Sequence, residues 1–167
     1  MKSETTKAHE KLSSYKIMGG VITLSDSITD VNDDISGKIL ADAIETKYTL
    51  ASRKLIPDDE NDLTQAIEEM LEDVDFIITT GGTGLNERDI TVETVEKLFD
   101  KKMEGFGELY RQESYKEIGL SSILSRATAG VYKKTLIFSL PGSPNAVKTG
   151  LRIIIDELPH IVFHAKG

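Results

Sequence analysis

The sequence predicts an α/β fold in three layers, with an open, mostly parallel, mixed sheet that carries helices on both faces. Short apolar runs suited to buried strands alternate with segments of helical periodicity along the chain. Two of these runs end in glycine-rich turns that directly precede a helical pattern. The 167 residues form one domain, since no internal repeat or linker divides them.

The first half of the chain supplies two strands and two helices. The apolar run Ile17–Leu24 predicts the first buried strand, and a helix follows from about Ser36 to Thr46 because its apolar residues share one face. Leu50–Ile56 predicts the second strand, which Pro57 breaks. The clearest helical spacing of apolar residues in the chain lies within Leu63–Val74.

The middle of the chain begins with a third strand, Phe76–Ile78, which runs into the turn Thr79–Gly84. Helical spacing then predicts a helix over Val92–Phe99 and another over Leu109–Ile118. Between them lies Gly105–Glu108, where glycines on both sides of a phenylalanine predict either a tight bend or a helix start.

The last part of the chain predicts a hairpin followed by a helix. Gly130–Tyr132 and Thr135–Leu140 are joined by a turn at Lys133-Lys134, so the sheet gains at least one antiparallel member. Ser143-Pro144 has the residue types of an N-cap and a first helical position. We expect Pro159 to end this last helix.

The composition of the chain limits the classes of function that it can have. The formal charge of −8 argues against nucleic acid as the main partner, because phosphate contacts need a basic face. No apolar run approaches the roughly 20 residues that span a bilayer, so we expect no membrane segment. The chain has no cysteine, which excludes disulfides and thiolate metal sites and fits a cytoplasmic protein. Residues 1–16 predict a flexible N-terminal arm, and residues 17–167 the domain.

Two glycine-rich turns are the strongest functional signal. Thr79–Gly84 and Ser139–Asn145 each follow a buried strand and precede a helix. Because the carboxyl ends of parallel strands meet at one edge, both turns and Pro57-Asp58 are expected to line one crevice. Helix N-termini and bare backbone N–H groups there suit anions such as phosphate. A purely structural turn is the alternative, since neither segment is a P-loop or a dinucleotide fingerprint.

Asp58 and Asp89 are expected to face this crevice together. Two carboxylates beside phosphate oxygens predict a bridging Mg²⁺, although a turn or helix cap is the alternative for each. The acidic loop Asp30–Asp34 is interpreted as a solvated loop with a helix cap, because the spacing of a Ca²⁺ loop is absent. No histidine is placed for nucleophilic catalysis, since His9, His160 and His164 lie near the chain ends.

Six short motifs occur in order and carry a family resemblance. They are ITLSDS (Ile22–Ser27), IPDD (Ile56–Asp59), TTGGTG with Arg88-Asp89, GFGE (Gly105–Glu108), LSRATAG (Leu124–Gly130) and FSLPGSPNAVKTGL (Phe138–Leu151). Together they resemble the molybdopterin adenylyltransferases of the MogA/MoaB type, which are related to the G domain of gephyrin. The resemblance covers about Lys16 to His164.

The resemblance implies a molybdopterin-binding-like fold and a role in molybdenum or tungsten cofactor biosynthesis. The implied reaction transfers AMP from Mg·ATP to the terminal phosphate of molybdopterin and releases pyrophosphate. Asp58 and Asp89 match the two key aspartates and would hold Mg²⁺. The matching substrate-binding positions are Ser25, Asp26, Thr80, Gly81, Gly82, Thr83, Gly84, Glu108, Ser139, Leu140, Pro141, Gly142, Ser143 and Pro144.

The same resemblance implies a homo-oligomer, either a trimer or a hexamer, with the metal-insertion protein of the pathway as a further candidate partner. One departure stands out: many members carry Arg or Lys just after the Ser-Asp pair, where this chain has Ser27-Ile28. The missing cation keeps open an alternative, in which the chain binds or carries molybdopterin or the finished cofactor without catalysis.

Overall fold

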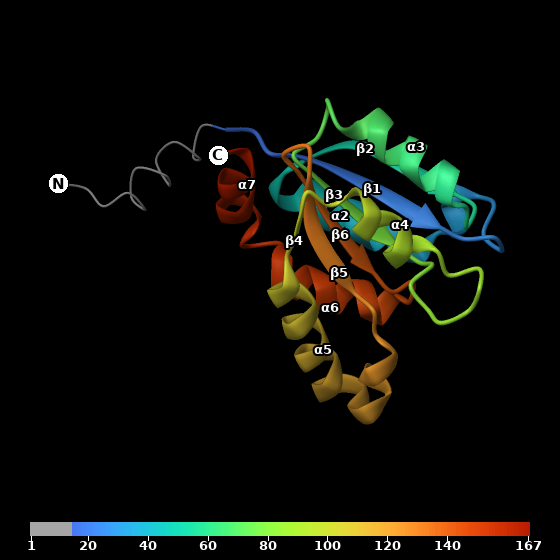
Figure 1. Cartoon of the computed structure of the whole chain (residues 1–167). Helices are drawn as coiled ribbons and strands as arrows, with labels where there is room; N and C mark the ends of the chain where they lie inside the picture. The colour runs from blue at the N-terminus through green and yellow to red at the C-terminus, as the bar shows by residue number, and fades with distance from the viewer. Residues whose placement is uncertain (1–14) are drawn as a thin grey trace.

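A computed structural model describes residues 15–167, so the predicted arm lies almost wholly outside the described residues, as does His9. A six-stranded mixed sheet forms the centre of the molecule (Figure 1), with the strand order β2-β1-β3-β6-β5-β4. The strands are β1 (Met18–Leu24), β2 (Thr49–Ile56), β3 (Phe76–Thr80), β4 (Lys101–Lys102), β5 (Thr128–Tyr132) and β6 (Thr135–Leu140). Neighbours among β2, β1, β3 and β6 pair in parallel, whereas β5 is antiparallel to both β6 and β4.

Alternating side chains of the central strands face two separate cores. Phe76 and Ile78 of β3 belong to one apolar cluster, while Ile77 between them belongs to the other. The first cluster packs against α2 (Ile35–Lys47), α5 (Glu104–Ile118), α6 (Pro144–Ile154) and α7 (Leu158–Lys166). The second packs against α3 (Glu60–Met70) and α4 (Thr91–Leu98). The predicted three-layer fold is therefore confirmed.

Short polar side chains fix where the helices begin. Asp59 caps α3 by accepting hydrogen bonds from the N–H groups of Asn61 and Asp62. Ser143 caps α6, as its sequence context predicted, and accepts from the N–H of Ala146. These caps set the direction in which each helix leaves the carboxyl edge of the sheet.

Five elements differ from the sequence-based expectation. The last helix is two helices: α6 ends at Ile154, and Pro159 lies in the first turn of α7. The prediction was wrong because proline suits a helix start as well as a stop. Helix α5 begins at Glu104, so the glycines around Phe106 belong to a helix start. The short strand β4 and the 3₁₀ helices η1 (Val31–Asp33) and η2 (Gly119–Leu124) had no periodic signal.

A buried carboxylate ties both ends of the described chain to the sheet. Asp75, just before β3, accepts hydrogen bonds from the N–H of Met18 and the hydroxyl of Tyr15, each at 2.8 Å. Lys166 of α7 lies 2.7 Å from the same carboxylate. No helix within residues 15–167 is long and apolar enough to cross a membrane.

Candidate active site

The two glycine-rich turns line one cleft of about 370 Å³ at the carboxyl edge of the sheet. They lie side by side because β3 and β6 are paired neighbours. The N–H of Gly81 donates to the carbonyl of Leu140 at 3.1 Å, and the hydroxyl of Thr80 donates to the carbonyl of Pro141 at 3.0 Å. Gly81 and Gly82 have φ angles of 93° and 66°, which L side chains rarely adopt. The predicted convergence of the two turns is confirmed.

Asp58 and Asp89 flank the first turn. A Cβ added at Gly82 would lie 2.9 Å from Oδ1 of Asp58, and one added at Gly84 would lie 2.6 Å from Oδ2 of Asp89. The absence of side chains at these glycines is therefore what lets both carboxylates reach the turn. Asp89 lines the cleft itself, whereas Asp58 lies against the turn without forming part of the cleft wall.

Asp58 is held by a reciprocal contact with Asp26. The N–H of Asp26 donates to Oδ2 of Asp58 at 3.1 Å, and the N–H of Asp58 donates to Oδ1 of Asp26 at 3.0 Å. Arg88 donates two hydrogen bonds to Oδ2 of Asp26, at 2.6 and 2.9 Å, and these hydrogen bonds lower the pKa of Asp26. Arg88 therefore contacts the site through Asp26, although its side chain lies at the surface.

The environment of Asp58 favours a bound cation. Burial raises its pKa, and the negative charges of Asp26 and Asp89 raise it further. Its Oδ1 atom is buried and has no hydrogen-bond partner among residues 15–167. No group of three or more His, Asp or Glu side chains in residues 15–167 is arranged to hold a metal ion. Two carboxylates completed by ligand phosphate and water nevertheless suit Mg²⁺, so the residues present fit that ion.

Asp89 closes its own loop and does not cap α4. Its Oδ2 atom accepts from the N–H of Asn86 at 2.9 Å, while Ile90 occupies the N-cap position without a side-chain bond. Thr91 instead secures the turn by donating from its hydroxyl to the carbonyl of Gly81 at 2.8 Å. The helix-cap alternative is thus wrong for Asp89, whose carboxylate stays in the cleft wall.

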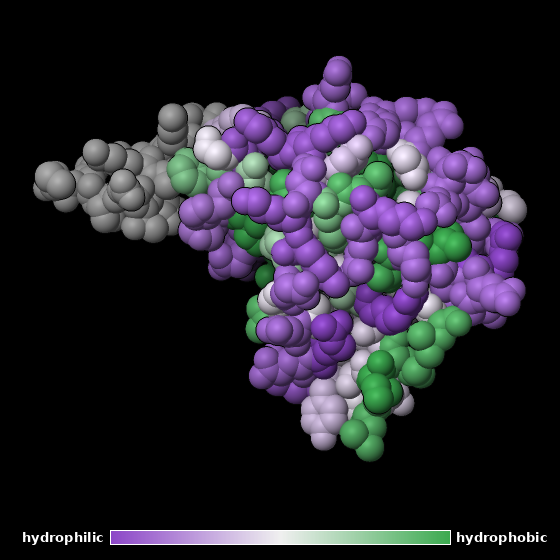
Figure 2. Space-filling model, viewed as in Figure 1, coloured by the Kyte–Doolittle hydropathy of each residue, from purple (hydrophilic) through white to green (hydrophobic). Residues whose placement is uncertain are grey.

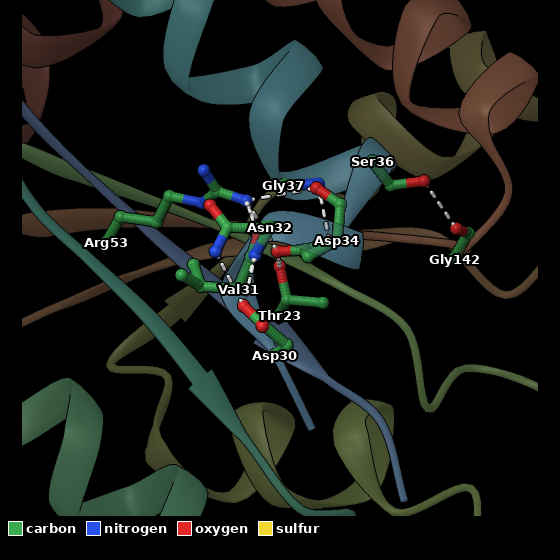
Figure 3. Close-up of polar contacts among 9 residues, drawn as sticks. All are labelled: Thr23, Asp30, Val31, Asn32, Asp34, Ser36, Gly37, Arg53 and Gly142. Atoms are coloured by element: carbon green, nitrogen blue, oxygen red, sulfur yellow. Dashed lines mark hydrogen bonds and ion pairs between the residues drawn. The ribbon is translucent and has the colours of Figure 1, made fainter. Parts of the chain in front are cut away.

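The second turn is anchored to the start of α2. The hydroxyl of Ser36 donates to the carbonyl of Gly142 at 2.7 Å (Figure 3). Ser36 is itself placed by Asp34, a carboxylate that is 1% exposed and caps α2 through the N–H of Gly37 at 2.9 Å. The predicted cap in the acidic loop is therefore confirmed, although it is buried.

Charge on the buried Asp34 is balanced from β1 and β2. Its Oδ2 atom accepts from the hydroxyl of Thr23 at 2.7 Å and from Arg53 at 3.1 Å, as drawn in Figure 3. Arg53 also donates to the carbonyls of Val31 and Asp34. Because these bonds join two strands to the loop before α2, they fix the position from which Ser36 reaches the second turn.

Other predicted site residues take different positions. Ser139 is fully buried and accepts a hydrogen bond of 2.8 Å from Thr79, and Leu140 is fully buried in the core. Ser25 accepts from the N–H of Ile28 at 3.0 Å and so shapes its own turn. Glu108 is exposed on α5 and lines neither this cleft nor a second cavity nearby. The predicted residues in the cleft wall are Gly81, Gly82, Thr83, Gly84, Asp89, Pro141, Gly142 and Ser143.

Helix α5 and the segment after it form the opposite wall, which the sequence analysis missed. Tyr110 faces the cleft, and burial raises the pKa of its phenol to about 12. It therefore stays protonated and donates to the carbonyl of Ala146 at 3.0 Å. Other wall residues include Ser114, Glu117, Ile118, Ser121, Leu124 and Ser125. Leu124 and Ser125 begin the motif LSRATAG, but the other wall residues belong to none of the six motifs.

Comparison with known proteins gives one consistent result. The model of a family described as a probable molybdopterin binding domain matches residues 20–160. The molybdopterin adenylyltransferase of Pyrococcus furiosus is 41% identical over 95% of this chain and 96% of its own. A probable molybdopterin adenylyltransferase of Methanocaldococcus jannaschii is 41% identical over 95% and 98%.

Solved structures agree with the sequence comparison. The tungsten cofactor synthesizing protein MoaB from Pyrococcus furiosus superposes with a TM-score of 0.85 at 40% identity, covering 91% of this chain and 98% of that one. The Mog protein from Mycobacterium ulcerans gives a TM-score of 0.81 at 30% identity. This chain belongs to the molybdopterin-binding domain family of molybdenum cofactor biosynthesis, as its six ordered motifs indicated.

Proposed function

We propose that this chain is a molybdopterin adenylyltransferase that acts in molybdenum or tungsten cofactor biosynthesis. The observation that carries the proposal is the pair Asp58 and Asp89 on the two sides of the first glycine turn, with the second turn across the same cleft. The names of relatives about 41% identical over nearly the whole chain support the same activity.

The reaction needs two anions to be held close together. An oxygen of the terminal molybdopterin phosphate bonds to the α-phosphorus of ATP while the bond from that phosphorus to the β-bridging oxygen breaks. The bonding electron pair leaves with pyrophosphate. The attacking phosphate is already ionised at neutral pH, so no histidine base is required.

The chain contributes positioning and charge compensation. Backbone N–H groups of the two turns other than that of Gly81, which already bonds Leu140, can donate to phosphate oxygens, and the N-terminus of α6 adds a favourable dipole. Asp58 and Asp89 would hold Mg²⁺, which when bound neutralises charge on the transferring phosphoryl group. Ser36 keeps the second turn in place through Gly142.

Turnover by the purified chain tests the proposal. With molybdopterin, ATP and Mg²⁺, we expect pyrophosphate release that Asp89→Ala lowers by at least about a hundredfold, the scale on which electrostatic groups act in catalysis. Asp73→Ala is the matched control, because Asp73 is an exposed carboxylate before the amino end of β3, whereas the turns follow the carboxyl ends of β3 and β6. Equal slow release by the wild type and Asp89→Ala would sink the proposal. Tight molybdopterin binding without release would favour the carrier function.

We also propose a homo-oligomer in which η2 and the end of α5 form an interface. Leu120 and Ile123 are 81% and 83% exposed, and Ile118 and Leu124 beside them are more than half exposed. Figure 2 shows this hydrophobic area at the lower right of the molecule. Large contiguous apolar patches mark interaction sites. Analytical ultracentrifugation should show a trimer or hexamer that Leu120→Glu dissociates; a monomeric wild type would contradict this.

A further inference from the structure

A second cavity of about 320 Å³ adjoins the active-site cleft. Residues 125–128 at the start of β5 form part of its wall, together with α4, α5 and the end of β4 at Lys102. Ser125 lines both cavities, so the two spaces meet at this residue. Arg126, in the same wall, donates to the carbonyl of Thr83 at 3.0 Å and links the second cavity to the first glycine turn.

Arg111 lies in the wall of this cavity and forms no ion pair with a carboxylate of the described residues. The chain has five arginines, and the ion pairs within residues 15–167 include every one of them except Arg111. The pairs are Arg53–Asp34, Arg88–Asp26, Arg126–Glu93 and Arg152–Glu117. In an acidic protein, an arginine left without a carboxylate beside a cavity suits a ligand that brings its own negative charge.

The fold places the Arg111 side chain at the wall of the cavity. A Cβ added at Gly107, one helical turn earlier, would lie 2.9 Å from a terminal guanidinium nitrogen of Arg111 and 3.0 Å from the carbonyl oxygen of Ala127. Glycine at this position therefore leaves room for the guanidinium, which lies 3.5 Å from the same carbonyl oxygen. Lys102, also in the wall, is already paired with Glu96 at 2.8 Å.

Ser125 supplies a second polar group at the junction. Its hydroxyl oxygen is buried and has no hydrogen-bond partner among the described residues. Buried polar groups in native proteins are nearly always satisfied, so an open hydroxyl between two cavities suggests that a ligand bonds it.

We propose that the second cavity binds the pyrophosphate portion of ATP, and pyrophosphate after transfer, through Arg111 and Ser125. This inference rests on the proposed adenylyl transfer. When the bond between the α-phosphorus and the bridging oxygen breaks, the leaving pyrophosphate gains negative charge, and a planar guanidinium is well suited to bind its oxygens. The main cleft then keeps the molybdopterin phosphate and the α-phosphate.

Direct binding of inorganic pyrophosphate tests the site apart from turnover. Isothermal titration calorimetry of the full chain with pyrophosphate and Mg²⁺ should give saturable binding that Arg111→Gln weakens about tenfold or more, the scale of one charge-assisted hydrogen bond. Ser125→Ala should weaken it several-fold. Lys148→Gln is the charge-matched control, since Lys148 is exposed on α6 and lines neither cavity.

The outcomes separate this inference from the proposed function. Unchanged pyrophosphate binding in both Arg111→Gln and Ser125→Ala overturns the inference, even where adenylyl transfer is normal. Binding that depends on Arg111 in a chain without turnover supports the site and counts against the activity. In an active chain, Arg111→Gln should also weaken product inhibition by pyrophosphate about tenfold, while the KM for molybdopterin stays unchanged. A raised KM for molybdopterin with unchanged product inhibition contradicts the assignment.

Discussion

Replacing Asp58 by asparagine is expected to stabilise the free protein while it removes turnover. The Asp58 carboxylate is partly buried and lies near the charges of Asp26 and Asp89, and its Oδ1 atom has no partner in the described part of the chain. Asparagine keeps an oxygen that can accept the N–H of Asp26, now 3.1 Å from Oδ2. It also removes the repulsion from Asp26 and Asp89, which the N–H of Asp26 and the charge of Arg88 offset only in part.

The gain comes from the negative charge that the substitution removes, since the side-chain amide leaves a polar atom at the Oδ1 position. An uncompensated buried polar or charged group costs about 1–3 kcal/mol, and the lower end applies here because Asp58 is only partly buried. A gain of about 1 kcal/mol raises the Tm of a domain of this size by roughly 2–4 °C. Groups that catalysis requires often lower the stability of the free protein in this way.

The pH dependence has a definite sign. The raised pKa means that the folded protein holds the Asp58 proton more tightly than the unfolded chain does. The wild type therefore gains stability from this group as the pH falls through the raised folded value. The advantage of Asp58→Asn is full at neutral pH and disappears below the ordinary aspartate pKa of about 3.9.

Thermal unfolding of both proteins in EDTA, from pH 7 down to pH 4, measures this difference. Other titrating groups largely cancel because the two chains differ only at Asp58. Two results would refute the argument that the Asp58 carboxylate is uncompensated in the free protein. One is a Tm for Asp58→Asn below that of the wild type at pH 7, and the other is a Tm difference between the two proteins that grows on acidification. Asp73→Asn provides the control, since it removes an exposed carboxylate.

Three further predictions concern groups around the site. Ser36→Ala should raise the KM for molybdopterin several-fold in steady-state assays with little change in Tm, because the anchor of Gly142 is lost; an unchanged KM would contradict that role. Arg88→Gln should move the acidic limb of the kcat/KM profile to higher pH, because the positive charge of Arg88 now lowers the pKa of Asp58; a shift to lower pH would contradict it. Asp75→Asn should cost about 2 kcal/mol in urea unfolding, since a nearly buried carboxylate loses its charge-assisted bonds; a change within error would show that this contact is dispensable.

The parts of the site that topology determines could be predicted from the sequence. Apolar runs identified β1, β3 and β6, and parallel strands place their carboxyl ends at one edge. That rule was enough to bring the two turns together and to place Asp58 and Asp89 near them. The identity of the capping residues followed from local chemistry, as at Ser143.

The parts that depend on side-chain direction could not be predicted. The sequence does not reveal that Arg88 turns back to Asp26, or that Oδ1 of Asp58 lacks a partner, because both depend on rotamers and loop geometry. The buried state of Asp34 was missed for a similar reason: its partner Arg53 comes from β2, across the sheet edge. Tyr110 has the spacing of a core residue, so nothing separated its wall position from simple packing.

An acidic chain that binds anions must concentrate positive potential at the binding site, and the structure indicates which groups provide it here. Four of the five arginines form ion pairs with carboxylates. To bind anions, the main cleft therefore relies on the N–H groups of the glycine turns and on the start of α6. Backbone donors do not move, and they leave the cleft uncrowded for a large ligand. Among residues 15–167, Arg111 is the arginine without an ion pair, and it lies in the wall of the adjoining cavity rather than that of the cleft. On the proposed assignment, backbone donors of the turns face the reacting phosphates in the cleft, and the Arg111 guanidinium faces the leaving pyrophosphate in the adjoining cavity, so the two groups of phosphates are bound by different parts of the chain.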